Sequence, residues 1–208
     1  GTLFPIYEQT IPATAKAAHD AGKAWVLDPV GLGIGSLRTK LLSELKPYKP
    51  TIVRGNASEI IALASLWELL DTEDALDRPR GVDTTDGVDA AREAAVTLAR
   101  YTGGAVVVSG EVDLVTDGAT VVRSHGGSEL MSKITGCGCS QGGVLAVYAT
   151  CADAFTAAVA GTSHYNLAGT RAAAVANAPA SFKVAFIDEL YRATGEEIAA
   201  NPMCVEEA

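Results

Sequence analysis

The sequence is poor in basic residues and in aromatic residues, and it has no long uninterrupted apolar run. Its 16 Lys and Arg residues are outnumbered by 25 Asp and Glu, which gives a net charge of −9 over 208 residues. Because no basic stripe is present, nucleic acid is not an expected partner. No apolar run reaches the length that crosses a bilayer, so a membrane partner is not expected either.

Cysteine is also scarce, with Cys137, Cys139, Cys151 and Cys204 as the only four. Two of them are separated by a single residue, which is a poor framework for disulfides, so the sequence predicts a reducing, cytoplasmic location. A metal site at Cys137 and Cys139 is disfavoured, because no second Cys/His pair has the spacing of metal ligands.

The composition that remains is that of a globular protein, with 48% apolar and 20% charged residues. The length predicts a single domain over residues 1–208. Short apolar runs at 24–27, 51–53 and 105–108 have the pattern of buried parallel strands, and helical patterns alternate with them. This alternation predicts an α/β fold, with a mainly parallel sheet covered by helices on both faces.

The remaining elements follow from periodicity, turn residues and capping signals. Asn56 and Glu59 have the spacing of a capping box. Asp117-Gly118 predicts a hairpin between two short strands. The acidic end from Glu196 is expected to be mobile. Helices are predicted at 14–21, 37–45 with Ser36 as the cap, 60–70, 88–101, 142–150, 152–174 and 181–192, short strands at 113–116 and 120–123, and a surface loop at 71–86.

The stretch with the clearest chemical meaning is residues 133–143, Lys-Ile-Thr-Gly-Cys-Gly-Cys-Ser-Gln-Gly-Gly. Alternate glycines before a helical pattern predict a loop whose backbone N–H groups face an anion at the helix N-terminus. Gly138 and Cys137 are the candidates for this anion hole, and Gly136 also allows close approach to the backbone. Cys139 falls where a helix N-terminus favours the thiolate form of a cysteine. An ordinary glycine-rich turn is the alternative.

Polar residues at the carboxyl ends of the predicted strands are expected to converge with this loop. Asp28, Arg54 and Ser109 each follow a predicted buried strand. Because parallel strands end at one edge of a sheet, these side chains should lie together near Cys139. Alternatively, Asp28 only forms a turn, Arg54 pairs with a surface carboxylate, and Glu59 only caps its helix.

Four motifs in order resemble the hydroxyethylthiazole kinase family, whose fold is ribokinase-like. They are residues 28–31 (Asp-Pro-Val-Gly), 54–59 (Arg-Gly-Asn-Ala-Ser-Glu), 109–113 (Ser-Gly-Glu-Val-Asp) and 133–139 (Lys-Ile-Thr-Gly-Cys-Gly-Cys). The resemblance implies a three-layer sandwich. It also implies ATP-dependent phosphorylation of the hydroxyl of 4-methyl-5-(2-hydroxyethyl)thiazole in thiamin biosynthesis or salvage, with Mg²⁺, by a homotrimer.

The same resemblance assigns roles to single residues. It implies that Arg54 and Ser109 contact ATP and that Gly136 contacts the substrate. Asp28 and Glu59 match acidic residues near the Mg²⁺ and the phosphates, and Cys139 matches the position beside the reacting hydroxyl.

The chemistry of the residues agrees with this assignment. Phosphoryl transfer needs charge neutralisation and positioning more than covalent help, and an arginine, carboxylates and backbone amides supply both. Related kinases have an Asp where this chain has Cys139. We therefore expect the thiol to aid positioning and proton transfer and not to act as a covalent nucleophile.

Two departures from the family pattern leave other hypotheses open. The family has a further N-terminal segment, with an Asn-rich turn and a Met at the thiazole, that does not precede Gly1 here; an exposed edge strand is therefore expected. Residues 178–182 read Ala-Pro-Ala-Ser-Phe where the family has Gly-Pro-Gly-Ser-Phe. The alternatives are a hydroxymethylpyrimidine-type kinase or nucleotide-hydrate dehydratase of the same fold, or a truncated, non-catalytic nucleotide-binding domain. Cys139 and the Arg-Gly-Asn motif disfavour another enzyme of this fold.

Overall fold

The computed structural model describes residues 3–70 and 87–208. The loop that the sequence predicts at 71–86 lies outside these residues. The helices are α1 (Tyr7–Asp20), α2 (Ser36–Leu45), α3 (Ala57–Leu66), α5 (Gly87–Ala90), α6 (Arg92–Thr102), α7 (Cys137–Tyr148), α8 (Ala154–Val175), α9 (Pro179–Arg192) and α10 (Gly195–Ala199), with short 3₁₀ helices η1 (Lys46–Tyr48) and η2 (Glu129–Lys133). The strands are β1 (Val26–Leu27), β2 (Ile52–Asn56), β3 (Ala105–Ser109), β4 (Asp113–Thr116), β5 (Thr120–Ser124) and β6 (Met203–Glu207).

The six described strands form one sheet in the order of the sequence, β1 to β6. β2 pairs in parallel with both β1 and β3, and the pairings from β3 onward are antiparallel. Two successive antiparallel pairings restore the strand direction, so β5 runs with β1, β2 and β3. The sheet is therefore mixed, with most of its described strands pointing the same way, and the α/β prediction is confirmed.

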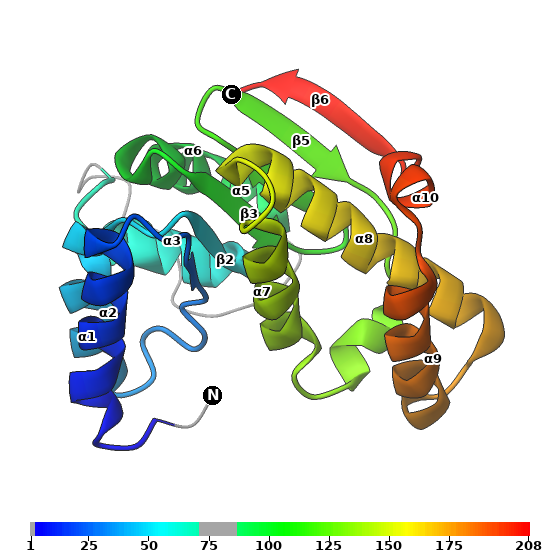
Figure 1. Cartoon of the computed structure of the whole chain (residues 1–208), viewed down its shortest axis with the longest axis horizontal. Helices are drawn as coiled ribbons and strands as arrows, with labels where there is room; N and C mark the ends of the chain where they lie inside the picture. Colours follow the sequence, from blue (N-terminus) through cyan, green and yellow to red (C-terminus); the bar gives the residue numbers. More distant parts are fainter. Residues whose placement is uncertain (1–2, 71–86) are drawn as a thin grey trace.

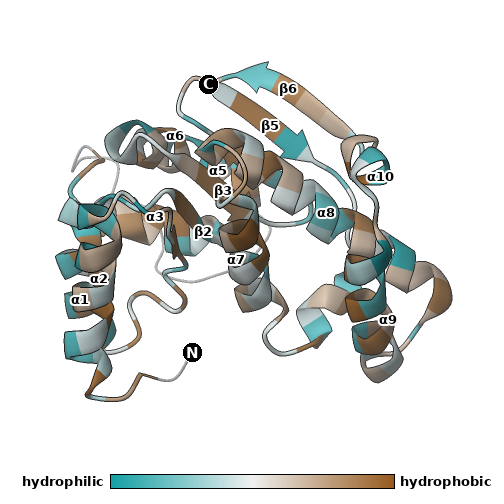
Figure 2. Cartoon of the chain, viewed as in Figure 1, coloured by the Kyte–Doolittle hydropathy of each residue, from teal (hydrophilic) through white to brown (hydrophobic). Residues whose placement is uncertain are grey.

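Helices cover both faces of the sheet and make three layers (Figure 1). Successive residues of β3 enter different cores, because side chains alternate across a strand. Val106 and Val108 pack with α1, α2, α3 and α6, whereas Ala105 and Val107 pack with α7 and α8. Figure 2 shows β3 in mostly apolar colours, as expected for a strand buried on both faces.

Helix α7 begins earlier than the sequence pattern predicts. We expected a helix from Gly142, but the helix starts at Cys137, with Gly136 as the N-cap at φ 85°. Glycine and serine have weak helix propensity, so the local signal for this first turn is poor. Its contacts with neighbouring elements, described below, stabilise it instead. The predicted helix 88–101 is likewise two helices, α5 and α6, separated at Ala91.

Ser36 does not cap α2 as predicted. It is the first residue of the helix, the N-cap is Gly35 at φ 84°, and no side chain makes a capping hydrogen bond there. A left-handed backbone at the N-cap is available to glycine without strain, which explains why Gly35 occupies this position.

The expectation that the acidic end is mobile is wrong. Thr194 and Glu197 form a capping box at the start of α10. Strand β6 then pairs with β5 along its whole length. Glu206 bonds Arg92 of α6 at 2.9 Å and Arg123 of β5 at 2.8 Å. Acidic residues that would repel one another in an isolated tail are thus matched by arginines distant in sequence.

Strand β1 lies at the other edge of the described sheet, next to an apolar groove. The groove has a volume of about 650 Å³ and runs between α1 and α2. Asp28 and Arg38 are the two charged residues among its otherwise mostly apolar lining. The predicted open edge is therefore present among the described strands.

Candidate active site

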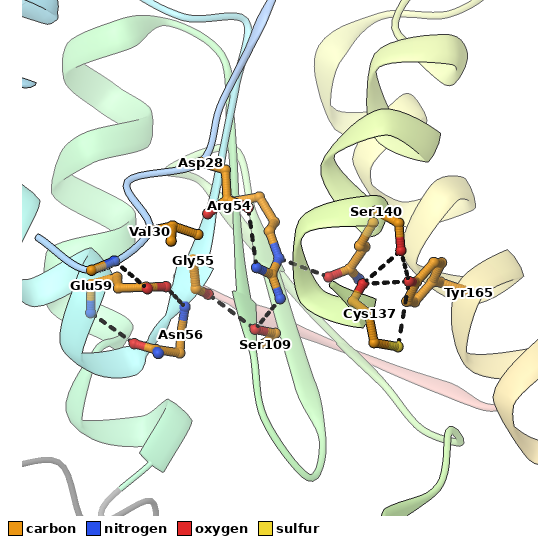
Figure 3. Close-up of polar contacts among 12 residues, drawn as sticks. Asp28, Val30, Arg54, Gly55, Asn56, Glu59, Ser109, Cys137, Ser140 and Tyr165 are labelled. Carbon is orange, nitrogen blue, oxygen red and sulfur yellow. Dashed lines mark hydrogen bonds and ion pairs between the residues drawn. The ribbon is translucent and has the colours of Figure 1, made fainter. Parts of the chain in front are cut away.

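Three polar residues meet where the parallel strands end. Asp28 follows β1 directly, Arg54 lies in β2, and Ser109 is the last residue of β3. Because β1, β2 and β3 run in the same direction, their carboxyl ends share one edge of the sheet. Figure 3 shows these side chains grouped around the Arg54 guanidinium, with the first turn of α7 beside them.

Arg54 is the centre of this group. Its Nη2 donates to Ser109 Oγ at 2.8 Å, its Nε donates to Gln141 Oε1 at 2.9 Å, and its Nη1 lies 3.4 Å from Asp28 Oδ2. The residue is only 7% exposed. The alternative of a surface ion pair is therefore wrong. A buried guanidinium bonded through three nitrogens has a fixed orientation, which preorganises a positive charge.

Asp28 offers an oxygen with no partner among the described residues. Oδ2 faces Arg54, while the buried Oδ1 accepts no hydrogen bond. Burial raises the pKa of this carboxyl group above its ordinary value; the charge of Glu59 raises it further, and Arg54 acts in the opposite direction. An unmatched carboxylate oxygen with a second carboxylate, Glu59, nearby is suited to a cation.

Glu59 forms the predicted capping box with Asn56 at the start of α3. Its Oε2 accepts from the Asn56 N–H at 2.9 Å, and Asn56 Oδ1 accepts from the Glu59 N–H at the same distance. The other oxygen, Oε1, accepts from the Gly31 N–H at 3.0 Å. The carboxylate thus ties the loop after β1 to α3, and the capping prediction is confirmed.

The N-terminus of α7 lies against the arginine. A Cβ atom placed on Gly138 would be 3.1 Å from both Nη1 and Nη2 of Arg54, so glycine allows the helix backbone to approach the guanidinium. The Cys137 N–H already donates to Ile134 O, at 3.4 Å. Cys139 is a free, exposed thiol in this first turn. A helix N-terminus and a buried cation side by side favour a bound anion.

Two buried polar residues near this site, Gln141 and Asp113, were not singled out from the sequence. Gln141 is buried in α7 and joins this helix to Arg54. Asp113 is 6% exposed and accepts from the Gly110 N–H at 2.8 Å. Burial raises the pKa of Asp113 to about 6, against the opposing effects of hydrogen bonds from Gly110, Asn166 and Gln141. For Asp113 the available signal was a polar residue between Val112 and Leu114, whereas Gln141, between Ser140 and Gly142, had no such signal.

The fold and this site define a ribokinase-like α/β protein in which a glycine-rich helix start lies beside a fixed arginine. A profile of the hydroxyethylthiazole kinase family matches residues 1–196. Hydroxyethylthiazole kinase from Bifidobacterium longum is 46% identical, over 99% of this chain and 71% of the relative. That from Clavibacter sepedonicus is 50% identical, over 96% of this chain and 70% of the relative. The chain belongs to the hydroxyethylthiazole kinase family.

Solved structures agree with this family. The hydroxyethylthiazole kinase protein from Pyrococcus horikoshii superimposes with a TM-score of 0.82 at 27% identity, over 100% of this chain and 74% of that one. Pyridoxal kinase from Staphylococcus aureus, in complex with AMP-PCP and pyridoxal, gives a TM-score of 0.56 at 19% identity, over 82% of this chain and 60% of that one. The second likeness concerns the fold alone. In the described part of the chain, no helix is both long and apolar enough to cross a bilayer.

Proposed function

We propose that this protein transfers a phosphoryl group from ATP to the hydroxyl of 4-methyl-5-(2-hydroxyethyl)thiazole, a step of thiamin biosynthesis or salvage. The observation that carries the proposal is the fixed Arg54 guanidinium beside the N-terminus of α7, at the carboxyl ends of three parallel strands. Membership of the hydroxyethylthiazole kinase family supports the choice of substrate.

Arg54 and Ser109 are the groups proposed to bind ATP. Arg54 supplies a positive charge that does not reorganise during the reaction, because Gln141 and Ser109 fix its orientation. Ser109 Oγ also lies within 3.3 Å of Gly55 O, so both strands hold the hydroxyl. Negative charge that develops on the phosphoryl oxygens is stabilised by such a cation and by the first-turn amides of α7.

Asp28 and Glu59 are the residues proposed to hold Mg²⁺. The unpartnered, buried Oδ1 of Asp28 fits a cation, whereas both oxygens of Glu59 already accept backbone N–H groups. We therefore propose that Asp28 binds the metal directly. Glu59 lies nearby without being a direct ligand. The described residues contain no cluster of three His, Cys, Asp or Glu ligands, which suits an ion that relies on phosphate and water. When bound, Mg²⁺ neutralises phosphate charge.

The first turn of α7 is proposed to receive the reacting groups. Gly136, in the left-handed region, contacts the substrate, and Gly138 provides the anion hole. Cys137 contributes less to this hole, because its N–H has a partner in Ile134 O. Cys139 orients the hydroxyl and accepts its proton, without forming a covalent intermediate.

The wider description of the protein is also a proposal. We propose one domain over residues 1–208, a cytoplasmic location and a homotrimer. The free cysteines support a reducing compartment. Exposed apolar side chains of α9, Val184 and Ile187, support association with other subunits. Light scattering would give a particle mass three times that of the chain.

The decisive experiment measures phosphate transfer from ATP to hydroxyethylthiazole with Mg²⁺. The wild-type chain is compared with Cys139→Ala and with Cys151→Ala, a matched exposed cysteine in the connection between α7 and α8. We expect turnover to fall about a hundredfold in Cys139→Ala, the usual size of general-base catalysis, and to be unchanged in Cys151→Ala.

Two other outcomes would revise the proposal. Wild-type turnover that is equal in Cys139→Ala would keep the kinase assignment and remove the role of the thiol. Failure of the wild-type chain to phosphorylate the thiazole while it still binds ATP would favour the alternative of a non-catalytic nucleotide-binding domain.

A further inference from the structure

Tyr165 of α8 reaches the first turn of α7 with its hydroxyl group. The phenol donates to the Cys137 carbonyl oxygen, lies 2.7 Å from Ser140 Oγ and lies 3.5 Å from Cys137 Sγ. Figure 3 shows the phenol pointing into this turn from the neighbouring helix. One side chain therefore contacts residues on both sides of Cys139.

The hydrogen-bond directions make this arrangement specific. The Tyr165 O–H donates to Cys137 O, and the single Ser140 hydroxyl proton points either to the same carbonyl oxygen, at 2.9 Å, or to the phenol oxygen. Burial raises the pKa of Tyr165, so the phenol keeps its proton at neutral pH. The donor that holds the turn is therefore present throughout the range in which kinases work.

A second contact holds α7 from the opposite side. Gln141, directly after Ser140, accepts from Arg54 Nε at 2.9 Å. The first turn is thus fixed between Arg54 of β2 and Tyr165 of α8. This turn carries Cys139 and the amides that face the proposed anion site, so its orientation sets where they point.

The Tyr165 ring, by contrast, is held without the hydroxyl. It packs edge-on against Phe186 with ring centroids 4.9 Å apart, in a core that includes Ala168 and Phe182. A phenylalanine would keep these contacts. The hydroxyl is therefore separable from the fold by one conservative substitution.

We infer that Tyr165 is a positioning residue, whose hydroxyl fixes the first turn of α7 so that Cys139 and the first-turn amides meet the reacting groups. The inference rests on the proposed kinase function for its catalytic consequence. The claim that the Tyr165 hydroxyl controls the orientation of Cys139 does not depend on that function.

The test is Tyr165→Phe, with Tyr191→Phe as the matched control because Tyr191 is 91% exposed on α9. One hydrogen bond lost from the aligned site corresponds to about a tenfold fall in kcat. We expect kcat to fall in this way, whereas the KM for ATP should stay within about twofold of the wild-type value, because the substitution leaves Arg54 and Ser109 unchanged. The unfolding midpoint should stay close to that of the wild type.

A second readout does not depend on turnover. In a background with Cys151→Ser and Cys204→Ser, Cys139 is the remaining exposed thiol, because Cys137 is buried. Tyr165→Phe should slow alkylation of Cys139 by iodoacetamide about threefold or more, because the hydroxyl no longer holds the turn that sets the orientation of the thiol. Tyr191→Phe should not change this rate.

The outcomes separate the two claims. Slower alkylation supports the inference even if the wild-type chain proves not to phosphorylate the thiazole. Unchanged alkylation together with unchanged kcat would overturn it. A parallel loss of kcat, ATP affinity and unfolding midpoint would also overturn it, because the hydroxyl would then serve only the stability of the fold.

Discussion

At the residue scale, Asp113 carries a buried carboxyl group behind the candidate site. Its pKa is raised to about 6 because burial penalises the charged form. The native state therefore binds more protons than the unfolded chain between about pH 4 and pH 6. Over this window, Asp113 makes the protein less stable as the pH rises, and above it the cost of the buried charge is complete.

Asp113→Asn should remove this pH-dependent cost. The amide oxygen can still accept from the Gly110 N–H, which bonds the carboxylate at 2.8 Å. Relative to the wild type, the variant should gain stability between pH 4.5 and pH 7.5, by up to about 3 kcal/mol. Urea unfolding at several pH values measures the difference. A difference between the two proteins that is the same at every pH would contradict the raised pKa.

At the element scale, two of the three glycines of helix α7, Gly138 and Gly143, have different surroundings. A Cβ atom on Gly138 would lie 3.1 Å from the Arg54 guanidinium, whereas one on Gly143 would have nothing within 4 Å. Both residues lie in the helix, where alanine is favoured over glycine by about 1 kcal/mol.

Gly138→Ala should therefore impair the site without unfolding the protein. We expect the Arg54 guanidinium to be displaced by a few tenths of an ångström and kcat/KM for ATP to fall about tenfold or more. Gly143→Ala, the control on the same helix, should keep full activity and gain stability. Equal activity of the two variants would mean that the close approach of α7 to Arg54 does not contribute to activity.

At the scale of the whole molecule, the carboxyl-terminal strand β6 is bonded to the middle of the chain. Glu206 of β6 bonds both Arg92 and Arg123, and the Glu206 side chain is about one-third exposed. Exposed pairs contribute little each, but a shared carboxylate links three elements in one network.

Glu206→Ala should lower the free energy of unfolding by roughly 1 kcal/mol, with Glu207→Ala as a control that makes the same charge change on the next residue. High salt should reduce the effect of Glu206→Ala, because it screens partly exposed ion pairs. Thermal unfolding at low and high salt measures this. Identical midpoints for the two variants would show that the network does not stabilise β6.

Much of the fold and part of the site follow from the sequence because their signals are local. The order of strands and helices is encoded in apolar periodicity, and the capping box of Asn56 and Glu59 joins residues three positions apart. Asp28, Arg54 and Ser109 were predicted to converge because parallel strands end at one edge of a sheet. The hairpin at Asp117 was predicted from its turn residues.

The tertiary structure alone decided which partners the buried polar groups have. Gln141 bonds Arg54 across 87 positions of sequence, and Tyr165 reaches Cys137 from another helix. The tertiary structure also orders the acidic end of the chain as strand β6, which pairs with β5. Periodicity and capping depend on near neighbours, and so the sequence by itself determined the elements and the motifs. Burial and hydrogen bonding between distant residues depend on packing, and so only the fold fixed the orientation of Arg54 and the raised pKa of Asp113.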